Sequence, residues 1–87
     1  MSSDEYIFPT QAAEQVAISD FAKMAAKRAR QAFKMARIDA NDLPATDIYD
    51  ECRDHAYDVL RSHGGEALVD LLLLDVADAA ASLIMGG

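Results

Sequence analysis

Apolar residues recur at helical spacing from Gln11 to Ile38, in a run that contains neither glycine nor proline. At about 100° per residue they gather on one side of a helix. They are Ile18, Phe21, Ala22, Ala25, Ala29, Ala32, Phe33 and Ala36. Thr10 stands where a helix N-cap is wanted. The pattern predicts a helix over residues 11–38, followed by a polar turn that contains Pro44.

A second helical pattern covers residues 46–63. Ile48, Cys52, Ala56 and Val59 follow one another at spacings of three and four and form its apolar side. Thr46 can cap its start, and acidic residues in the first turn favour the helix dipole. The Gly64-Gly65 pair then predicts a helix end, because glycine readily adopts the left-handed conformation of a C-terminal cap.

The segment 66–85 is apolar on two sides. One wide side holds Val69, Leu72, Leu73, Val76, Ala80, Leu83 and Ile84. Leu71, Leu74 and Met85 lie on the other side, where Asp70, Asp75 and Asp78 interrupt them. A membrane span is excluded, because each aspartate near the bilayer centre costs about 2.5–3.5 kcal/mol. We therefore expect the second side to be covered by another subunit, or else by the overhanging end of helix 11–38.

Together these segments predict an all-α fold and a single domain over residues 1–87. The expected architecture is a three-helix bundle with a long first helix, dimerising through the C-terminal helix. Residues 1–9 are predicted to form a short N-terminal arm whose apolar cluster, Tyr6-Ile7-Phe8, packs across the bundle or onto a neighbouring subunit; a recognition motif is the alternative. Self-association also supplements the core of a chain this small, since Cys52 is the only cysteine and no disulfide can form within the chain.

The composition indicates a folded, acidic protein. Hydrophobic residues make up 52% of the chain and charged residues 26%, which is typical of a globular protein. The start of the sequence has acids where a secretory signal has its basic region, and a lone thiol suits a reducing compartment. The expected location is the cytoplasm.

Charge is segregated along the chain, although the formal net charge is only −7. Residues 21–38 carry six bases and no acid, whereas residues 39–87 carry eleven acids and two bases. We call the first set the basic stripe: Lys23, Lys27, Arg30, Lys34 and Arg37. We call the second the acidic face: Asp47, Asp50, Glu51, Asp54 and Asp58. Each lies away from the apolar side of its own helix, so both are expected to face outward, where solvation alone is one sufficient explanation. Like charges one turn apart repel by a few tenths of a kcal/mol, which favours a binding role.

The sequence offers no convincing catalytic or metal site. Cys52, His55 and His63 lie on one helix, whereas a metal wants ligands that converge from several directions. Acidic neighbours disfavour a reactive Cys52 thiolate, so a small buried core residue is the better interpretation. No glycine loop is placed to hold a phosphate. The chain is therefore predicted to be no enzyme and to need no metal or cofactor.

Three hypotheses for function remain. The first is a non-catalytic protein-binding regulator or inhibitor, of the type of small phage or mobile-element anti-defence proteins (anti-CRISPR proteins included). Its acidic face would act as a DNA mimic on a nucleic-acid-binding partner. The second is an anion-binding module that contacts nucleic acid or a nucleotide through the basic stripe, which the overall acidity disfavours. The third is a structural subunit that assembles with itself. We adopt the first, with a protein partner, a homo-oligomer and no membrane contact as its expectations.

Overall fold

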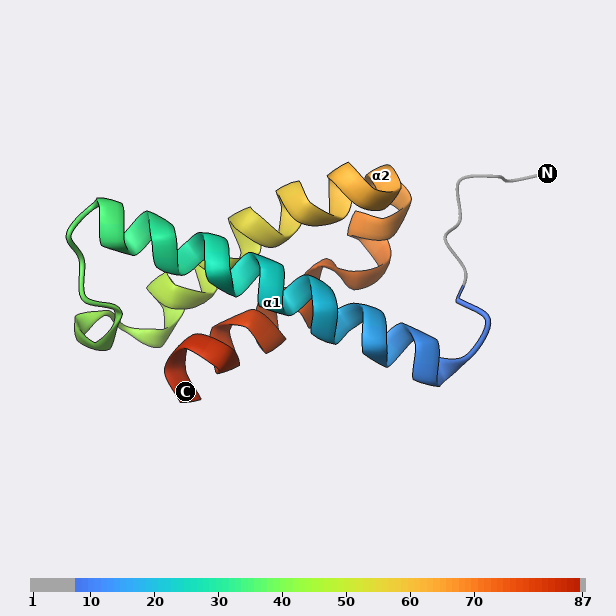
Figure 1. The fold of residues 1–87 in the computed structure, drawn as a ribbon, viewed down its shortest axis with the longest axis horizontal. Coiled ribbons are helices and arrows are strands. Elements are labelled where there is room, and N and C mark those ends of the chain that lie inside the picture. Colours follow the sequence, from blue (N-terminus) through green and yellow to red (C-terminus); the bar gives the residue numbers. More distant parts are fainter. Residues whose placement is uncertain (1–7, 87) are drawn as a thin grey trace.

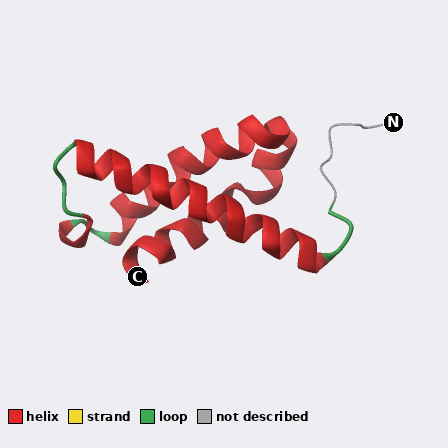
Figure 2. Cartoon of the chain, in the orientation of Figure 1, coloured by secondary structure: helices red, strands yellow, loops and turns green. Residues whose placement is uncertain are grey.

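The structure, a computed structural model, describes residues 8–86. Its elements are helix α1 (Gln11–Met35), a short 3-10 helix η1 (Ala40–Asp42) and helix α2 (Ala45–Gly86), and these residues contain no strand. Short loops join the elements (Figure 2). The predicted all-α class is confirmed, but the three-helix bundle is not: two helices pack against each other as a hairpin.

The difference lies at the glycine pair. The predicted helices 46–63 and 66–85 form the single element α2, which is kinked at Gly65. A straight helix of 42 residues would measure about 63 Å, yet the longest dimension of the molecule is 47 Å. We call residues 45–64 the N-terminal arm and residues 66–86 the C-terminal arm; Figure 1 shows the chain turning back between them, with α1 lying across both.

The two glycines act differently at this kink. Gly65 has φ +70° and ψ −163°, a combination that is essentially restricted to glycine. Gly64 lacks a side chain where one would collide with Leu68, since an added Cβ would lie 2.6 Å from the Leu68 Cβ. The sequence alone thus predicts that the helix is interrupted at the glycine pair. Whether the helix ends or bends there depends on how the following arm packs.

Helix α1 begins as predicted and ends earlier. The Thr10 hydroxyl oxygen accepts a hydrogen bond of 3.0 Å from the Ala13 amide, which confirms Thr10 as the N-cap. The helix stops at Met35 instead of Ile38, because Arg37 adopts a positive φ of 60°. The Ile38 amide then donates to the Phe33 carbonyl and the Arg37 amide to the Lys34 carbonyl, which is the Schellman pattern.

Helix α2 starts one residue before the predicted segment. The Pro44 carbonyl accepts from the amides of Asp47 and Ile48, so the first turn already includes Ala45. Thr46 consequently lies inside the helix and does not cap it. The chain reaches this point through η1, where the Asp39 carboxylate accepts from the Asn41 amide at 2.9 Å.

The core lies between α1 and both arms of α2. Its α1 part is mostly alanine, which lets the helices approach closely. The buried α1 residues are Ile18, Ala22, Ala25, Ala26, Ala29 and Phe33. From α2 the largest fully buried side chains are Val59, Leu60, Leu68, Leu72 and Val76. Most of the segment 1–9, which was predicted to form an arm ahead of α1, lies outside the described residues. Phe8 is half-buried and packs against this core.

Candidate functional site

The acidic face lies on the N-terminal arm of α2, opposite the side that packs into the core. Ile48, Cys52, Ala56 and Val59 are buried, so residues half a turn away point to solvent. Four of its five carboxylates are exposed, and Glu51 is half-buried. Glu51 is also the only member with a partner among residues 8–86, as its Oε2 atom lies 2.9 Å from His55 Nε2.

Four residues of the basic stripe lie on α1, and Arg37 follows just after its end. All five residues of the stripe are exposed. Arg30 nevertheless donates from its guanidinium to the Leu83 carbonyl at 2.8 Å, near the end of α2. Lys23 lines a shallow hollow of about 300 Å³ together with Ser82 and Leu83. The stripe is exposed as expected, but Arg30 also contacts α2 through this exposed hydrogen bond, which the sequence did not predict.

The acidic face and the basic stripe do not neutralise each other within the described part of the chain. The ion pairs found there are His55–Glu51 at 2.9 Å and Arg61–Glu66 at 3.4 Å, and neither involves the basic stripe. The second belongs to a small group at the kink, where the Tyr57 hydroxyl also donates to Glu66 at 2.9 Å. Both charged surfaces thus keep unpaired groups for a partner.

The side chains predicted to mediate self-association are exposed. Leu74 exposes 62% of its surface, Met85 50% and Leu71 41%, so α1 does not cover them. Asp70, Asp75 and Asp78 are exposed on the same arm. This surface thus combines exposed apolar side chains with exposed carboxylates.

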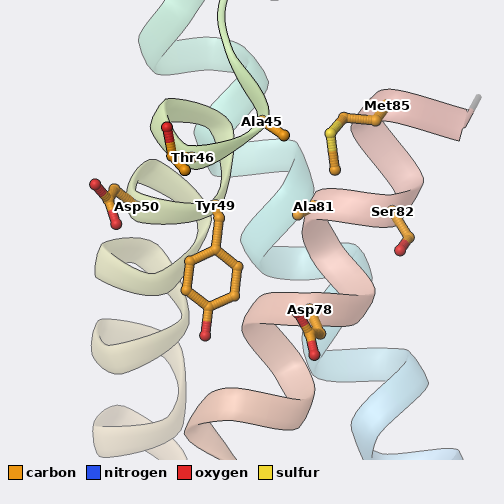
Figure 3. Close-up of a pocket in the computed structure, with 8 residues that line it drawn as sticks. All are labelled: Ala45, Thr46, Tyr49, Asp50, Asp78, Ala81, Ser82 and Met85. Carbon is orange, nitrogen blue, oxygen red and sulfur yellow. The ribbon is translucent and has the colours of Figure 1, made fainter.

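A groove that sequence reasoning missed lies where the two arms of α2 end side by side (Figure 3). Its volume is about 330 Å³. The N-terminal arm contributes Ala45, Thr46, Tyr49 and Asp50. The C-terminal arm contributes Asp78, Ala81, Ser82 and Met85. No local pattern predicts this groove, because its walls are more than twenty-five residues apart and meet only after the chain folds back at Gly65.

Cys52 is fully buried, as predicted for a core residue. Burial raises the pKa of its thiol from 9.0 to about 11; the Glu51 carboxylate adds to the rise and Arg30 opposes it. A thiol held neutral in this way is a poor nucleophile at neutral pH. Among residues 8–86 no three histidine, cysteine or acidic side chains are placed to hold a metal ion.

Comparison with known protein families, curated proteins and solved structures gives no match for this chain. Within the described residues, no helix combines the length and apolarity that crossing a membrane requires. The case for function therefore rests on the charged surfaces and the groove.

Proposed function

We propose that this chain is a non-catalytic protein-binding regulator or inhibitor whose acidic face occupies a basic, nucleic-acid-binding surface of its partner. One observation carries the proposal. The five carboxylates follow one arm of a helix, and no base of the described chain pairs with the four that are exposed. A solvated helix face needs no such uniform sign, since alternating charges would repel less.

The spacing of these charges supports mimicry of a nucleic acid strand. Asp47 and Asp58 are eleven residues apart, which corresponds to about 16 Å along a helix axis. Five carboxylates over that length give one charge per about 4 Å, close to the one phosphate per about 3.4 Å of a DNA strand. We place such an inhibitor among the anti-defence proteins of phages and mobile elements. A compact acidic helix can occupy the nucleic-acid-binding groove of a partner protein without catalysing a reaction.

Charge reversal within the acidic face tests the proposal. The wild-type chain is immobilised, proteins of the host lysate are captured, and the bound proteins are identified by mass spectrometry. We expect a basic nucleic-acid-binding protein that duplex DNA displaces and that rising salt releases. The triple variant Asp47→Lys, Asp54→Lys, Asp58→Lys should lose it.

A variant with the same change of charge elsewhere is the control. Glu14→Lys, Asp20→Lys, Asp42→Lys alters three acids that lie outside both the acidic face and the C-terminal arm of α2, and it should retain the partner. Capture of the same protein by both variants, with the same salt dependence, would contradict the proposal.

The anion-binding alternative keeps one favourable observation: Lys23, Lys27 and Lys34 are exposed and have no acidic partner in the described chain. It loses strength because Arg30 is engaged with the Leu83 carbonyl. Titration with a fluorescent oligonucleotide at low salt separates the two ideas. Binding tighter than about 100 μM, the weak end of non-specific DNA binding, would favour the alternative.

A further inference from the structure

The groove between the arms of α2 combines an apolar lining with negative charge. Ala45, Ala81 and Met85 supply aliphatic surface, and Figure 3 shows the Tyr49 ring projecting into the space between the two arms. Asp50 and Asp78 stand on opposite arms, and neither forms a hydrogen bond or ion pair with another described residue. In Figure 3 the Asp78 carboxylate stands at the edge of the space between the arms, whereas the Asp50 carboxylate points to the outer side of the N-terminal arm. The groove thus has apolar walls, one carboxylate at its edge and a second close by.

This combination selects a cation on an aliphatic stem. A carboxylate beside an aromatic ring attracts an ammonium or guanidinium group through both charge and the ring quadrupole. The stem of a lysine or arginine side chain gains by covering apolar surface while its head group stays in contact with water and acids. An anionic ligand would meet repulsion from these carboxylates, whereas a neutral apolar one would gain no charge attraction from them.

The neighbouring surface indicates that this cation belongs to a protein segment. Leu71, Leu74 and Asp78 follow one another at spacings of three and four and therefore share one side of the C-terminal arm with Met85. The exposed leucines consequently lead along that arm toward the groove. A segment that places lysine or arginine in the groove can lay its apolar residues on Leu71 and Leu74.

A second copy of the chain packed symmetrically on this arm is a poor occupant. Such a pair would bring Asp70, Asp75 and Asp78 of one copy close to the same three residues of the other, because a two-fold interface apposes the same surface on both subunits. A cationic partner would neutralise these aspartates while covering the same leucines.

We propose that the groove binds a lysine or arginine side chain of a partner protein, with Leu71 and Leu74 receiving apolar residues of the same segment. The proposal rests on the chain's being a protein-binding module, but it does not depend on the acidic face being the surface used. The volume of the groove, about 330 Å³, is at the low end for ligand pockets, which suits one or two side chains.

Nuclear magnetic resonance with a model peptide tests this directly. The probe is a 14-residue helical peptide of leucine and alanine with two lysines one turn apart, and its match has glutamine in place of both lysines. At low salt we expect the lysine peptide to shift the amide signals of Tyr49, Asp78 and Met85, and the glutamine peptide to bind at least about fivefold more weakly.

Paired variants locate the charge. Asp50→Asn, Asp78→Asn removes both groove carboxylates and should weaken the lysine peptide by about fivefold, whereas Asp70→Asn, Asp75→Asn makes the same change of charge beside the groove and should weaken it less than twofold. The amide spectrum of each variant shows whether it is folded.

The proposal is overturned if both peptides bind equally, if neither shifts the groove signals, or if the shifts fall on Asp54 and Asp58 instead. The variants that test the acidic face leave Asp50 and Asp78 intact, so the two proposals fail separately. Loss of the host partner in the acidic-face variant, with peptide binding retained, would support both.

Discussion

At the scale of single residues, Arg37 occupies a position better suited to glycine. Its φ of 60° closes the Schellman pattern at the end of α1. The left-handed conformation costs an L-residue with a side chain roughly 1–2 kcal/mol. The sequence offers no sign of this, because a helix-favouring residue stands there, and for that reason the predicted helix ran on to Ile38.

Arg37→Gly should therefore stabilise the chain, by about 0.5–1 kcal/mol once the greater freedom of glycine in the unfolded state is allowed for. Urea unfolding followed by circular dichroism measures the change. Arg37→Ala is the matched control, since it removes the side chain but leaves the backbone strained, and it should change stability little. Equal effects of the two substitutions would mean that the side chain, not the backbone, is responsible.

Cys52 makes stability depend on alkaline pH. Its thiol is buried and its pKa is raised from 9.0 to about 11, so the folded state retains the proton more strongly than the unfolded state does. This contribution is complete below pH 9 and is lost as the pH rises toward 11; a shift of two units corresponds to about 3 kcal/mol. The free energy of unfolding should fall across that interval, and Cys52→Ala should remove most of the fall.

Tyr57 is the control for that experiment, because its phenol also ionises only at alkaline pH and its hydrogen bond to Glu66 raises the pKa of that phenol. Tyr57→Phe should leave most of the decline in place, since it removes only a hydroxyl whose hydrogen bond to Glu66 is exposed to solvent. A decline that survives Cys52→Ala but disappears in Tyr57→Phe would show that Tyr57, not Cys52, causes the pH dependence, and it would contradict this prediction.

At the scale of elements, the kink in α2 depends on both glycines. Gly65→Ala forces a side chain into a conformation restricted to glycine and should destabilise the chain by about 1–3 kcal/mol. Gly64→Ala should also destabilise it, because its Cβ would displace the buried Leu68 side chain. Gly86→Ala is the comparison, as nothing lies within 4 Å of a Cβ added there. Thermal unfolding of the three variants gives the order; three equal melting temperatures would contradict this account of the kink.

The elements also show how far the sequence could lead. Thr10 identified the start of α1, and the buried side of the N-terminal arm followed from the spacing of Ile48, Cys52 and Ala56, because both signals are local. The bend at Gly65 was read as a helix end, since the direction of the chain after a glycine pair is decided by the packing of Leu68 and its neighbours. The groove could not be predicted for the same reason. The contact of Arg30 with Leu83 likewise joins residues that are far apart in the sequence.

At the scale of the whole molecule, the exposed leucines of the C-terminal arm favour self-association while the aspartates beside them oppose it. The predicted homo-oligomer should therefore strengthen with salt, because screening weakens repulsion between aspartates of two copies but leaves apolar burial intact. Sedimentation velocity from about 0.05 to about 0.5 M sodium chloride measures this, over a range in which the screening length falls well below 10 Å.

Leu71→Gln, Leu74→Gln should abolish the high-salt species, whereas Val16→Gln, a change at another exposed apolar residue, should not. An oligomer that dissolves as salt rises would instead point to contacts between the basic stripe of one copy and the acidic face of another. That result would favour the structural-subunit hypothesis over the regulator.

The reversal of α2 has a practical side for anyone who handles the protein. Because the helix returns on itself, Ala45 and Met85 border the same hollow, and whatever is attached behind the last residue emerges beside it. A purification handle or fluorescent reporter fused at the carboxyl end would lie beside the groove and compete with a partner for it. Helix α1 begins at the opposite end of the molecule from the first turn of α2 (Figure 1), so the amino end is the better place for a handle in a screen for partners of the groove.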